Sequence, residues 1–223
     1  MTNEELEELI KNCPTLFHMA ERGSWAAIKE RGLLSTSALL DAYGVTGSKR
    51  TDIEVKHRQT SISIKTETLP KAVLRDQMAM DDEGLEDCLL DDLKPSDWYK
   101  TLYSKVFFWL SEDRLHRLTG ARAYREHEHD VIELDTASMI EAHYNKIWLC
   151  PINSGFTKQD PAKRGKGTFA RIHDYRYHER KKRTTQERVV ELCVDHSVTD
   201  IREHVKRVIV KKGKTELGII EQR

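Results

Sequence analysis

The stretch Arg188-Val189-Val190-Glu191-Leu192-Cys193-Val194 reads as a buried β-strand that carries a single carboxylate. Strand side chains alternate, so Glu191 shares one face with Val189 and Cys193, and Val190, Leu192 and Val194 fill the other. Burying a carboxylate without a partner costs several kcal/mol. The pattern therefore indicates one of two things: an ion pair with a nearby arginine, or a carboxylate placed for chemistry.

The length and charge of the chain favour one mixed α+β domain over residues 1–223. Lys and Arg together number 37 and so do Asp and Glu, which argues against a protein that binds polyanions with its whole surface. The charge is nevertheless segregated. Residues 81–97 hold eight acidic residues against Lys94 alone, within an acidic insertion at about 66–97 that is expected to form surface helix and loop. Residues 158–188 hold 11 Lys and Arg against four Asp and Glu, in a basic loop at about 153–187.

Local signals place most of the expected helices and strands. Thr2 and Glu5 form a capping box for a first helix, Gly32 ends a helix that begins after Ser24, and Pro95 starts another. Periodicity predicts a sheet of about six strands and a C-terminal helix from Asp200. The expected strands are 16–19, 61–65, 106–110, 131–135, 146–149 and the Glu191 run; further helices are expected at 36–43, 112–119 and 136–143.

The cysteines and the N-terminus indicate a soluble, cytoplasmic protein without a membrane partner. Cys13, Cys88, Cys150 and Cys193 stand too far apart for a disulfide framework or a close zinc motif. The first residues are acidic, and no apolar run reaches membrane-spanning length. The segment 127–130, His-Glu-His-Asp, lacks a third ligand at helical spacing, so no metal site is expected.

Four short segments, in the same order, resemble the DarT-type ADP-ribosyltransferases. The first, Leu16-Phe17-His18-Met19-Ala20-Glu21-Arg22-Gly23-Ser24 and the helix that follows it, resembles the opening motif in which a strand, turn and helix hold NAD. The others are 53–58, which ends in Arg58, the aromatic strand 105–110 and the segment 188–201 with Glu191. Two features depart from the family: Ala20 replaces the usual Thr, and the gap between Arg58 and Phe107 is longer. Arg75, in that gap, is the second candidate for the arginine role.

The resemblance implies an ADP-ribosyltransferase-like split β-sheet with flanking helices and NAD as substrate. Cleaving the nicotinamide–ribose bond builds positive charge on the ribose, which a nearby carboxylate stabilises, and a guanidinium offers forked donors to phosphate. Glu191 and Arg58 are the expected catalytic residues. The expected NAD-binding residues are His18, Met19, Ala20, Arg75 and Phe108.

The basic loop bears on the acceptor, because cations interleaved with aromatic residues suit phosphates and unpaired bases. With the resemblance, this predicts transfer of ADP-ribose to a DNA or RNA base, by a toxin or anti-phage defence effector with an antitoxin partner. A 2'-phosphotransferase-like enzyme and a non-catalytic nucleic-acid-binding module are the alternatives. The expected nucleic-acid contacts are Lys163, Arg164, Lys166, Arg171 and Tyr175.

Overall fold

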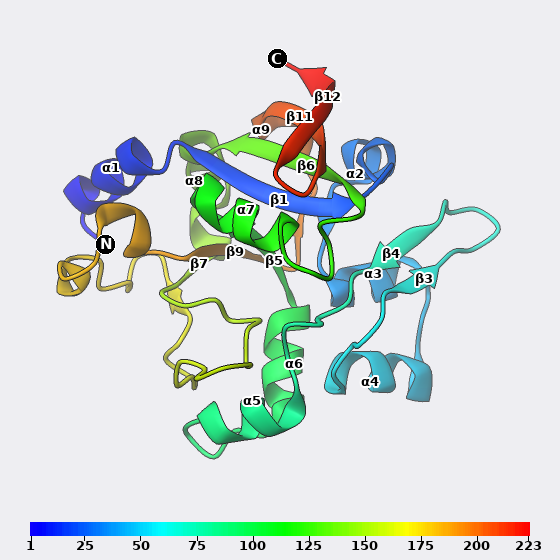
Figure 1. The fold of residues 1–223 in the computed structure, drawn as a ribbon, viewed down its shortest axis with the longest axis horizontal. Helices are drawn as coiled ribbons and strands as arrows, with labels where there is room; N and C mark the ends of the chain where they lie inside the picture. The colour runs from blue at the N-terminus through cyan, green and yellow to red at the C-terminus, as the bar shows by residue number, and fades with distance from the viewer.

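The computed structural model describes residues 1–223, which build a mixed α+β fold around one eight-stranded antiparallel sheet (Figure 1). The strand order is β12-β11-β6-β1-β5-β9-β7-β8, and two small two-stranded sheets pair β10 with β2 and β3 with β4. The strands are β1 (Thr15–Glu21), β2 (Leu33–Leu34), β3 (Ile62–Ile64), β4 (Ala72–Leu74), β5 (Lys105–Trp109), β6 (Glu128–Asp135), β7 (Ile147–Cys150), β8 (Ala170–Arg171), β9 (Glu191–Asp195), β10 (Ser197–Val198), β11 (Val205–Lys212) and β12 (Thr215–Gln222).

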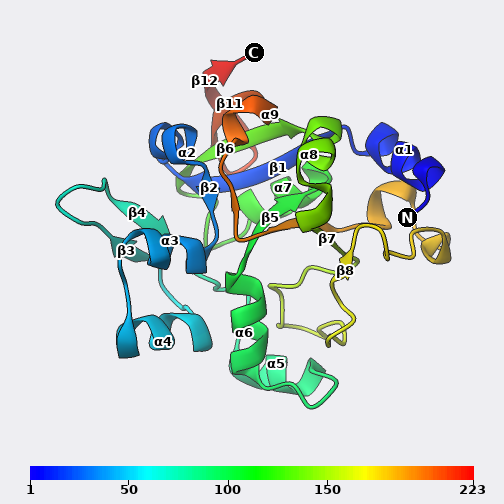
Figure 2. The same ribbon diagram turned by 180° about the vertical axis from the view of Figure 1, so that it is seen from behind.

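Helices cover both faces of the large sheet. Helix α7 crosses the face nearest the viewer in Figure 1, and α8 covers the opposite face, as the view from behind in Figure 2 shows. No helix has both the length and the apolar character that a membrane crossing requires. The α-helices are α1 (Asn3–Asn12), α2 (Trp25–Arg31), α3 (Thr36–Ala42), α4 (Gly47–Val55), α5 (Asp82–Cys88), α6 (Pro95–Tyr103), α7 (Glu112–Thr119), α8 (Thr136–His143) and α9 (Ile201–His204); Tyr144–Lys146, His178–Arg180 and Thr185–Glu187 form 3-10 turns.

The local start and stop signals of the sequence are confirmed. The Glu5 backbone N–H donates to the Thr2 hydroxyl at 3.2 Å, and the Thr2 backbone N–H donates to the Glu5 carboxylate at 2.8 Å, which is a complete capping box. Pro95 occupies the first turn of α6. Gly32 ends α2 at φ +87°, and a Cβ there would lie 2.5 Å from the Thr199 Cα. Both the backbone angle and the close approach therefore require glycine.

The hydrophobic core is divided by the sheet. The largest cluster lies on the side of α8, where Met139 and Ile140 pack with sheet residues such as Leu16, Phe108 and Leu192. On the side of α7, Leu115 packs against Phe17, Val131 and Ile209. A second cluster on that side joins α5 and α6 to the sheet through Trp98, Cys150, Phe169 and Cys193. Burial on both faces explains why the Glu191 strand reads as a nearly continuous apolar run.

Three sequence expectations are corrected. The sheet has eight strands instead of about six, and the C-terminal helix is the single turn α9, followed by the β11–β12 hairpin. Strand β11 pairs with β6, and its Val208 and Ile209 are fully buried, so this pairing outweighs the weak helical signal after Asp200. The acidic insertion contributes Met80, Leu85 and Cys88 to the core, instead of forming only surface.

The large sheet opens between β1 and β5. Strand β1 pairs with β6 along its whole length but with β5 only at Phe17↔Trp109. Strand β5 continues to pair with β9 from Lys105 to Trp109. The backbones of β1 and β5 therefore separate beyond that one pair, in the middle of the sheet.

Candidate active site

Glu191 is the first residue of β9, and its side chain is buried without a cationic partner. The residue is 3% exposed. Its Oε1 accepts a 3.1 Å hydrogen bond from the Ser154 backbone N–H, whereas Oε2 is buried and has no hydrogen-bond partner. No ion pair joins this carboxylate to an arginine or a lysine, so the ion-pair interpretation of the sequence is not supported.

The environment of Glu191 changes its acidity. Burial raises the pKa of Glu191 to about 7, and Ser154, the nearby Cys150 side chain and the positive charge of Arg114 oppose the rise only in part. A carboxyl group with such a pKa exchanges a proton easily near neutral pH. Arg114, in the first half of α7, was not singled out in the sequence, because nothing local distinguishes it from other helical arginines.

A rigid turn presents the Ser154 N–H to Glu191. The Ser154 carbonyl accepts hydrogen bonds from Arg164 Nη1 at 2.8 Å and from the Trp98 indole at 3.2 Å. Arg164 also donates to the Phe156 carbonyl at 2.8 Å, and Arg164 is 1% exposed. The turn after β7 therefore holds Glu191 in place. The Ser154 N–H donates to Glu191 and has no further proton to donate to a ligand.

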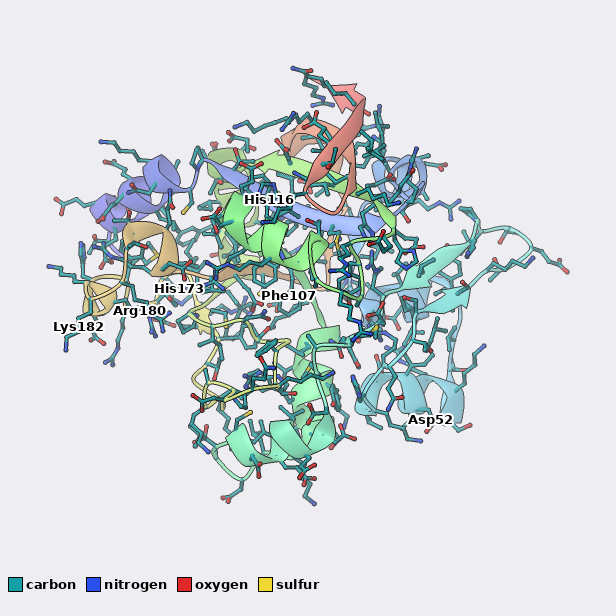
Figure 3. The ribbon with its side chains drawn as sticks, viewed as in Figure 1. Asp52, Phe107, His116, His173, Arg180 and Lys182 are labelled. Atoms are coloured by element: carbon teal, nitrogen blue, oxygen red, sulfur yellow. The ribbon has the colours of Figure 1, made fainter.

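Aromatic side chains lie beside Glu191 on the same face of the sheet. Trp109 is its cross-strand neighbour, and Phe107 follows two residues away on the same face. Both are half-buried, and Phe107, labelled in Figure 3, packs edge-on against Phe169 with ring centres 6.2 Å apart. Phe108 points to the other face, where it is 1% exposed in the core and packs beside His18 with ring centres 5.8 Å apart. Its ring therefore lacks the open face expected of it, and Phe107 is the more open of the two.

His18 bridges the opening between β1 and β5. Its Nδ1 lies 2.9 Å from the Phe107 carbonyl oxygen, so Nδ1 carries the proton and donates it. Burial lowers the pKa of His18 to about 4, and the charge of Arg75 adds to this effect. The ring is therefore neutral near pH 7, with Nε2 free of a proton. Of its neighbours along β1, Met19 is half-buried and Ala20 is buried.

Arg58 and Arg75, the two candidates for the arginine role, lie next to each other. Arg58 Nε donates to the Arg75 carbonyl at 2.5 Å, and its guanidinium lies 4.4 Å from the centre of the Tyr103 ring. Arg58 is 8% exposed, and its Nη1 is buried without a hydrogen-bond partner. Burial lowers the pKa of Arg58. The Arg75 side chain is more open, with Nη1 3.3 Å from His129 Nδ1 and 3.7 Å from Glu21 Oε2.

Arg58 and Arg75 are adjacent, and Arg75 lies near enough to His18 for its charge to act on that ring, whereas Glu191 lies apart from these residues. Glu191 shares a face with Phe17 and Trp109, whereas His18 alternates with Phe17 and points to the other face. No direct contact joins Glu191 to the other three. The carbonyl that His18 holds belongs to Phe107, a diagonal neighbour of Glu191, and such neighbours lie about 7–8 Å apart.

Several residues of the basic loop are buried or bonded within the fold, which its basic composition does not indicate. Arg164 and Tyr175 are buried, and the Tyr175 hydroxyl donates to the Arg188 carbonyl, so neither can contact nucleic acid as expected. Arg171 is held by Asp195 at 2.8 Å and stacks on Trp148. Lys163 and Lys166 are exposed, as are Arg176, Lys181, Lys182 and Arg183 farther along.

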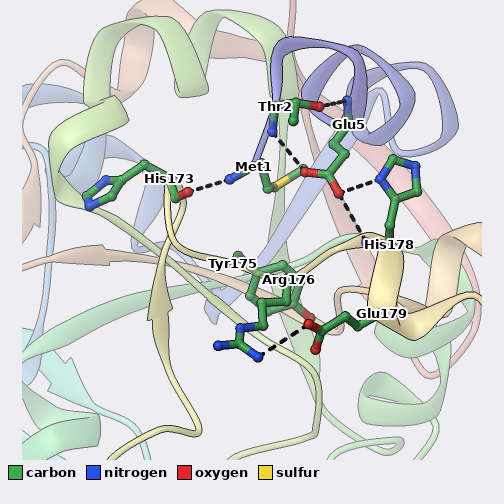
Figure 4. A pocket seen from close by; sticks show the side chains of 8 residues that line it. All are labelled: Met1, Thr2, Glu5, His173, Tyr175, Arg176, His178 and Glu179. Carbon is green, nitrogen blue, oxygen red and sulfur yellow. Dashed lines mark hydrogen bonds and ion pairs between the residues drawn. The ribbon is translucent and has the colours of Figure 1, made fainter.

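Two cavities lie away from Glu191. One, of about 400 Å³, lies between the N-terminus and the basic loop and is lined by Glu5, His178 and their neighbours (Figure 4). There the Met1 amino group donates to the His173 carbonyl, and His178 contacts the Glu5 carboxylate. The other, of about 510 Å³, is lined by residues 43–46 and 63–65 and by Lys49. Neither cavity includes a residue expected for NAD binding.

Comparison with known proteins identifies one family. A family model described as a family of unknown function (DUF7002) matches residues 14–205, which include every residue of the candidate site. No curated protein and no solved structure matches the chain.

Proposed function

Since the chain belongs to the DUF7002 family, whose function is unknown, we propose its function from the site: an NAD-dependent ADP-ribosyltransferase that modifies a nucleic-acid base. The cytoplasm is the proposed location. The fold proposed with it is an ADP-ribosyltransferase-like split sheet. The opening between β1 and β5 supports this fold, because it separates the first strand from the strand beside Glu191.

One observation carries the proposal: the buried, unpartnered Oε2 of Glu191. Leaving a polar atom buried and unsatisfied costs about 1–3 kcal/mol, and more when it is charged. A purely structural role does not repay this cost, since Ser154 already satisfies the other oxygen. A substrate hydroxyl or a proton received during reaction gives Oε2 a partner.

The reaction uses the negative charge of the Glu191 carboxylate and also its ability to take up a proton near neutral pH. The bond between the ribose C1' and the nicotinamide nitrogen breaks, and its electron pair leaves with nicotinamide. Ionised Glu191 stabilises the cationic ribose, a ring nitrogen or exocyclic amine of the base supplies the electron pair of the new C1'–N bond, and Oε2 receives the proton released by that nitrogen. A pKa of about 7 suits Glu191 to return this proton to water.

The group on the other side of the β1–β5 opening supplies binding. Neutral His18 offers Nε2 as an acceptor for a ribose hydroxyl, because Nδ1 is committed to Phe107. The free Nη1 of Arg58 and the more open guanidinium of Arg75 offer donors for the pyrophosphate oxygens. Phe107, half-buried between the two groups, offers a ring face to nicotinamide.

Substrate entry requires a local movement. Glu191 is 3% exposed, so the ribose reaches Oε2 only when the neighbouring Trp109 side chain or the turn that holds Ser154 shifts. We expect Trp109 to move, because Arg164 and Trp98 fasten the turn.

The acceptor is assigned from the exposed part of the basic loop. Lys163, Lys166 and Lys182 are exposed, and surface cations of this kind bind phosphates without base selectivity. Unchecked modification of nucleic acid harms the cell that makes the enzyme, so the proposal includes a role as a toxin or defence effector and an antitoxin partner.

The test is transfer of label from NAD. We would incubate the protein with NAD labelled in the adenosine part, together with single-stranded DNA, RNA or a protein mixture, and compare wild type with Glu191→Gln. Label in a nucleic-acid pool, lost in Glu191→Gln, is the expected result. Glu133→Gln is the matched control, because Glu133 is also a sheet carboxylate but is held by Arg207 at 2.8 Å. Transfer to protein, or equal transfer by Glu191→Gln and wild type, contradicts the proposal.

A further inference from the structure

Three potential metal ligands meet where α8 and α9 come together. His143 is the last residue of α8, Asp200 precedes the first turn of α9, and His204 ends α9. One donor atom from each lies within 4.8 Å of the other two. Because His143 lies 57 residues before Asp200, no sequence motif announces this group.

The donor atoms of these side chains are buried and lack partners. His143 is 8% exposed and His204 is 6% exposed. The Nε2 atoms of both histidines and Oδ1 of Asp200 have no hydrogen-bond partner. His143 Nε2 lies 3.0 Å from Asp200 Oδ1, and His204 Nε2 lies 3.4 Å from Oδ2, yet neither contact has the geometry of a hydrogen bond. Unsatisfied buried atoms at one point indicate a missing common partner.

The distances suit a tetrahedral transition-metal ion. Zinc binds imidazole nitrogen and carboxylate oxygen at about 2.0–2.2 Å, which places tetrahedral ligands about 3.4 Å apart. The observed separations are of this size: 3.0 Å from His143 Nε2 to Asp200 Oδ1 and 3.4 Å from His204 Nε2 to the other carboxylate oxygen, Oδ2. We propose that His143, Asp200 and His204 bind a divalent transition-metal ion, with zinc preferred for this set of two imidazoles and one carboxylate.

Neighbouring groups prepare the site for an ion. His204 Nδ1 lies 3.0 Å from the Ser138 hydroxyl, which orients the ring and directs Nε2 to the common point. The Asp200 side chain is 34% exposed, so water has access to the fourth position. The ion joins α8 to the turn that leads into β11 and stabilises the C-terminal part of the sheet. None of these ligands belongs to the proposed transferase site, so the two proposals fail separately.

Metal titration tests the proposal. The full chain, without a histidine tag and treated with a chelator, is titrated with Zn²⁺ by calorimetry and with Co²⁺ by visible absorption. We expect one ion per chain, the intense absorption of tetrahedral Co²⁺, and a higher thermal midpoint with Zn²⁺. His204→Ala should weaken binding by more than about 100-fold, since losing even an outer partner costs about 10–100-fold.

Two further variants keep the test decisive. Asp200→Asn conserves size at a partly exposed position, so it should fold and still lose the tetrahedral Co²⁺ spectrum. His196→Ala is the control, because His196 is close in sequence and its side chain is 61% exposed. Absence of stoichiometric binding by wild type, or equal binding by wild type and Asp200→Asn, overturns the proposal and leaves an ion pair between Asp200 and the two histidines.

Discussion

His18 Nδ1 donates a 2.9 Å hydrogen bond to the Phe107 carbonyl across the opening between β1 and β5. A side chain thus connects two neighbouring strands where their backbones no longer pair. The contact sets the protonation of the ring and also the position of Phe107, a half-buried aromatic residue diagonal to Glu191 on the same face of the sheet.

Replacing His18 separates these two effects. His18→Ala should lower the free energy of unfolding by about 1 kcal/mol or more through the lost hydrogen bond and abolish NAD binding. His18→Asn can still donate to the Phe107 carbonyl and should restore most of the stability but not the binding. Chemical denaturation and NAD calorimetry measure the two quantities. If both variants bind NAD like wild type, His18 has only a structural role.

Glu191 should make stability depend on pH. Its pKa is about 7 in the folded protein and near its ordinary value of 4.5 when unfolded, so the folded state favours the protonated form. Below about pH 4.5, where Glu191 is protonated in both states, it therefore does not lower the free energy of unfolding. As the pH rises to about 7, its ionisation in the unfolded state lowers the stability of the fold progressively. Since Gln cannot ionise, Glu191→Gln should gain roughly 3 kcal/mol over wild type between about pH 4.5 and pH 8.

Urea denaturation of wild type, Glu191→Gln and Glu133→Gln at both pH values measures this difference. The control variant loses the ion pair with Arg207 and should be less stable than wild type at the higher pH. An unchanged gap between wild type and Glu191→Gln across the pH range would show that Glu191 keeps an ordinary pKa.

Arg58 and Arg75 should respond differently to replacement by lysine. Arg58 is buried on the Tyr103 ring and bonded to the Arg75 carbonyl, so Arg58→Lys should destabilise the fold by about 1–3 kcal/mol. Arg75 is more exposed, and Arg75→Lys should weaken NAD binding with little change in stability. Thermal unfolding and NAD titration of both variants distinguish the residues; a stable Arg58→Lys with weakened binding would reverse their assignment.

Substitutions of Arg164 and Lys166 should affect different properties: the first the stability of the fold, and the second the binding of nucleic acid. Arg164→Ala removes the side-chain donor of the Phe156 carbonyl, leaves the Ser154 carbonyl with the Trp98 indole alone, and should cost about 3 kcal/mol or more. Lys166→Ala should leave stability unchanged and weaken binding of single-stranded nucleic acid, with a smaller dependence on salt. Denaturation and binding at two salt concentrations measure this. Unchanged binding by Lys166→Ala and by Lys163→Ala would exclude this part of the loop from the acceptor site.

Short-range patterns in the chain were sufficient for much of the fold and for identifying Glu191 as the principal candidate residue. The capping box at Thr2, the stop at Gly32 and the helices 112–119 and 136–143 depend on neighbours within a few residues, and each is confirmed. Glu191 stood out for the same reason, because a carboxylate inside an apolar strand needs no alignment or structure to be noticed.

Long-range pairing decided the rest. Residues 205–212 form strand β11 because they pair with β6. Arg164 is buried because the turn at Ser154 offers carbonyl groups to its guanidinium. The sequence favoured Phe108 over Phe107 as the more open ring, which the structure reverses because the face to which each side chain of β5 points depends on the register of β5 with β9. His143 and Asp200 meet only after α8 and α9 have packed. Such contacts join residues far apart in the chain, and their energies depend on neighbours that no local window contains.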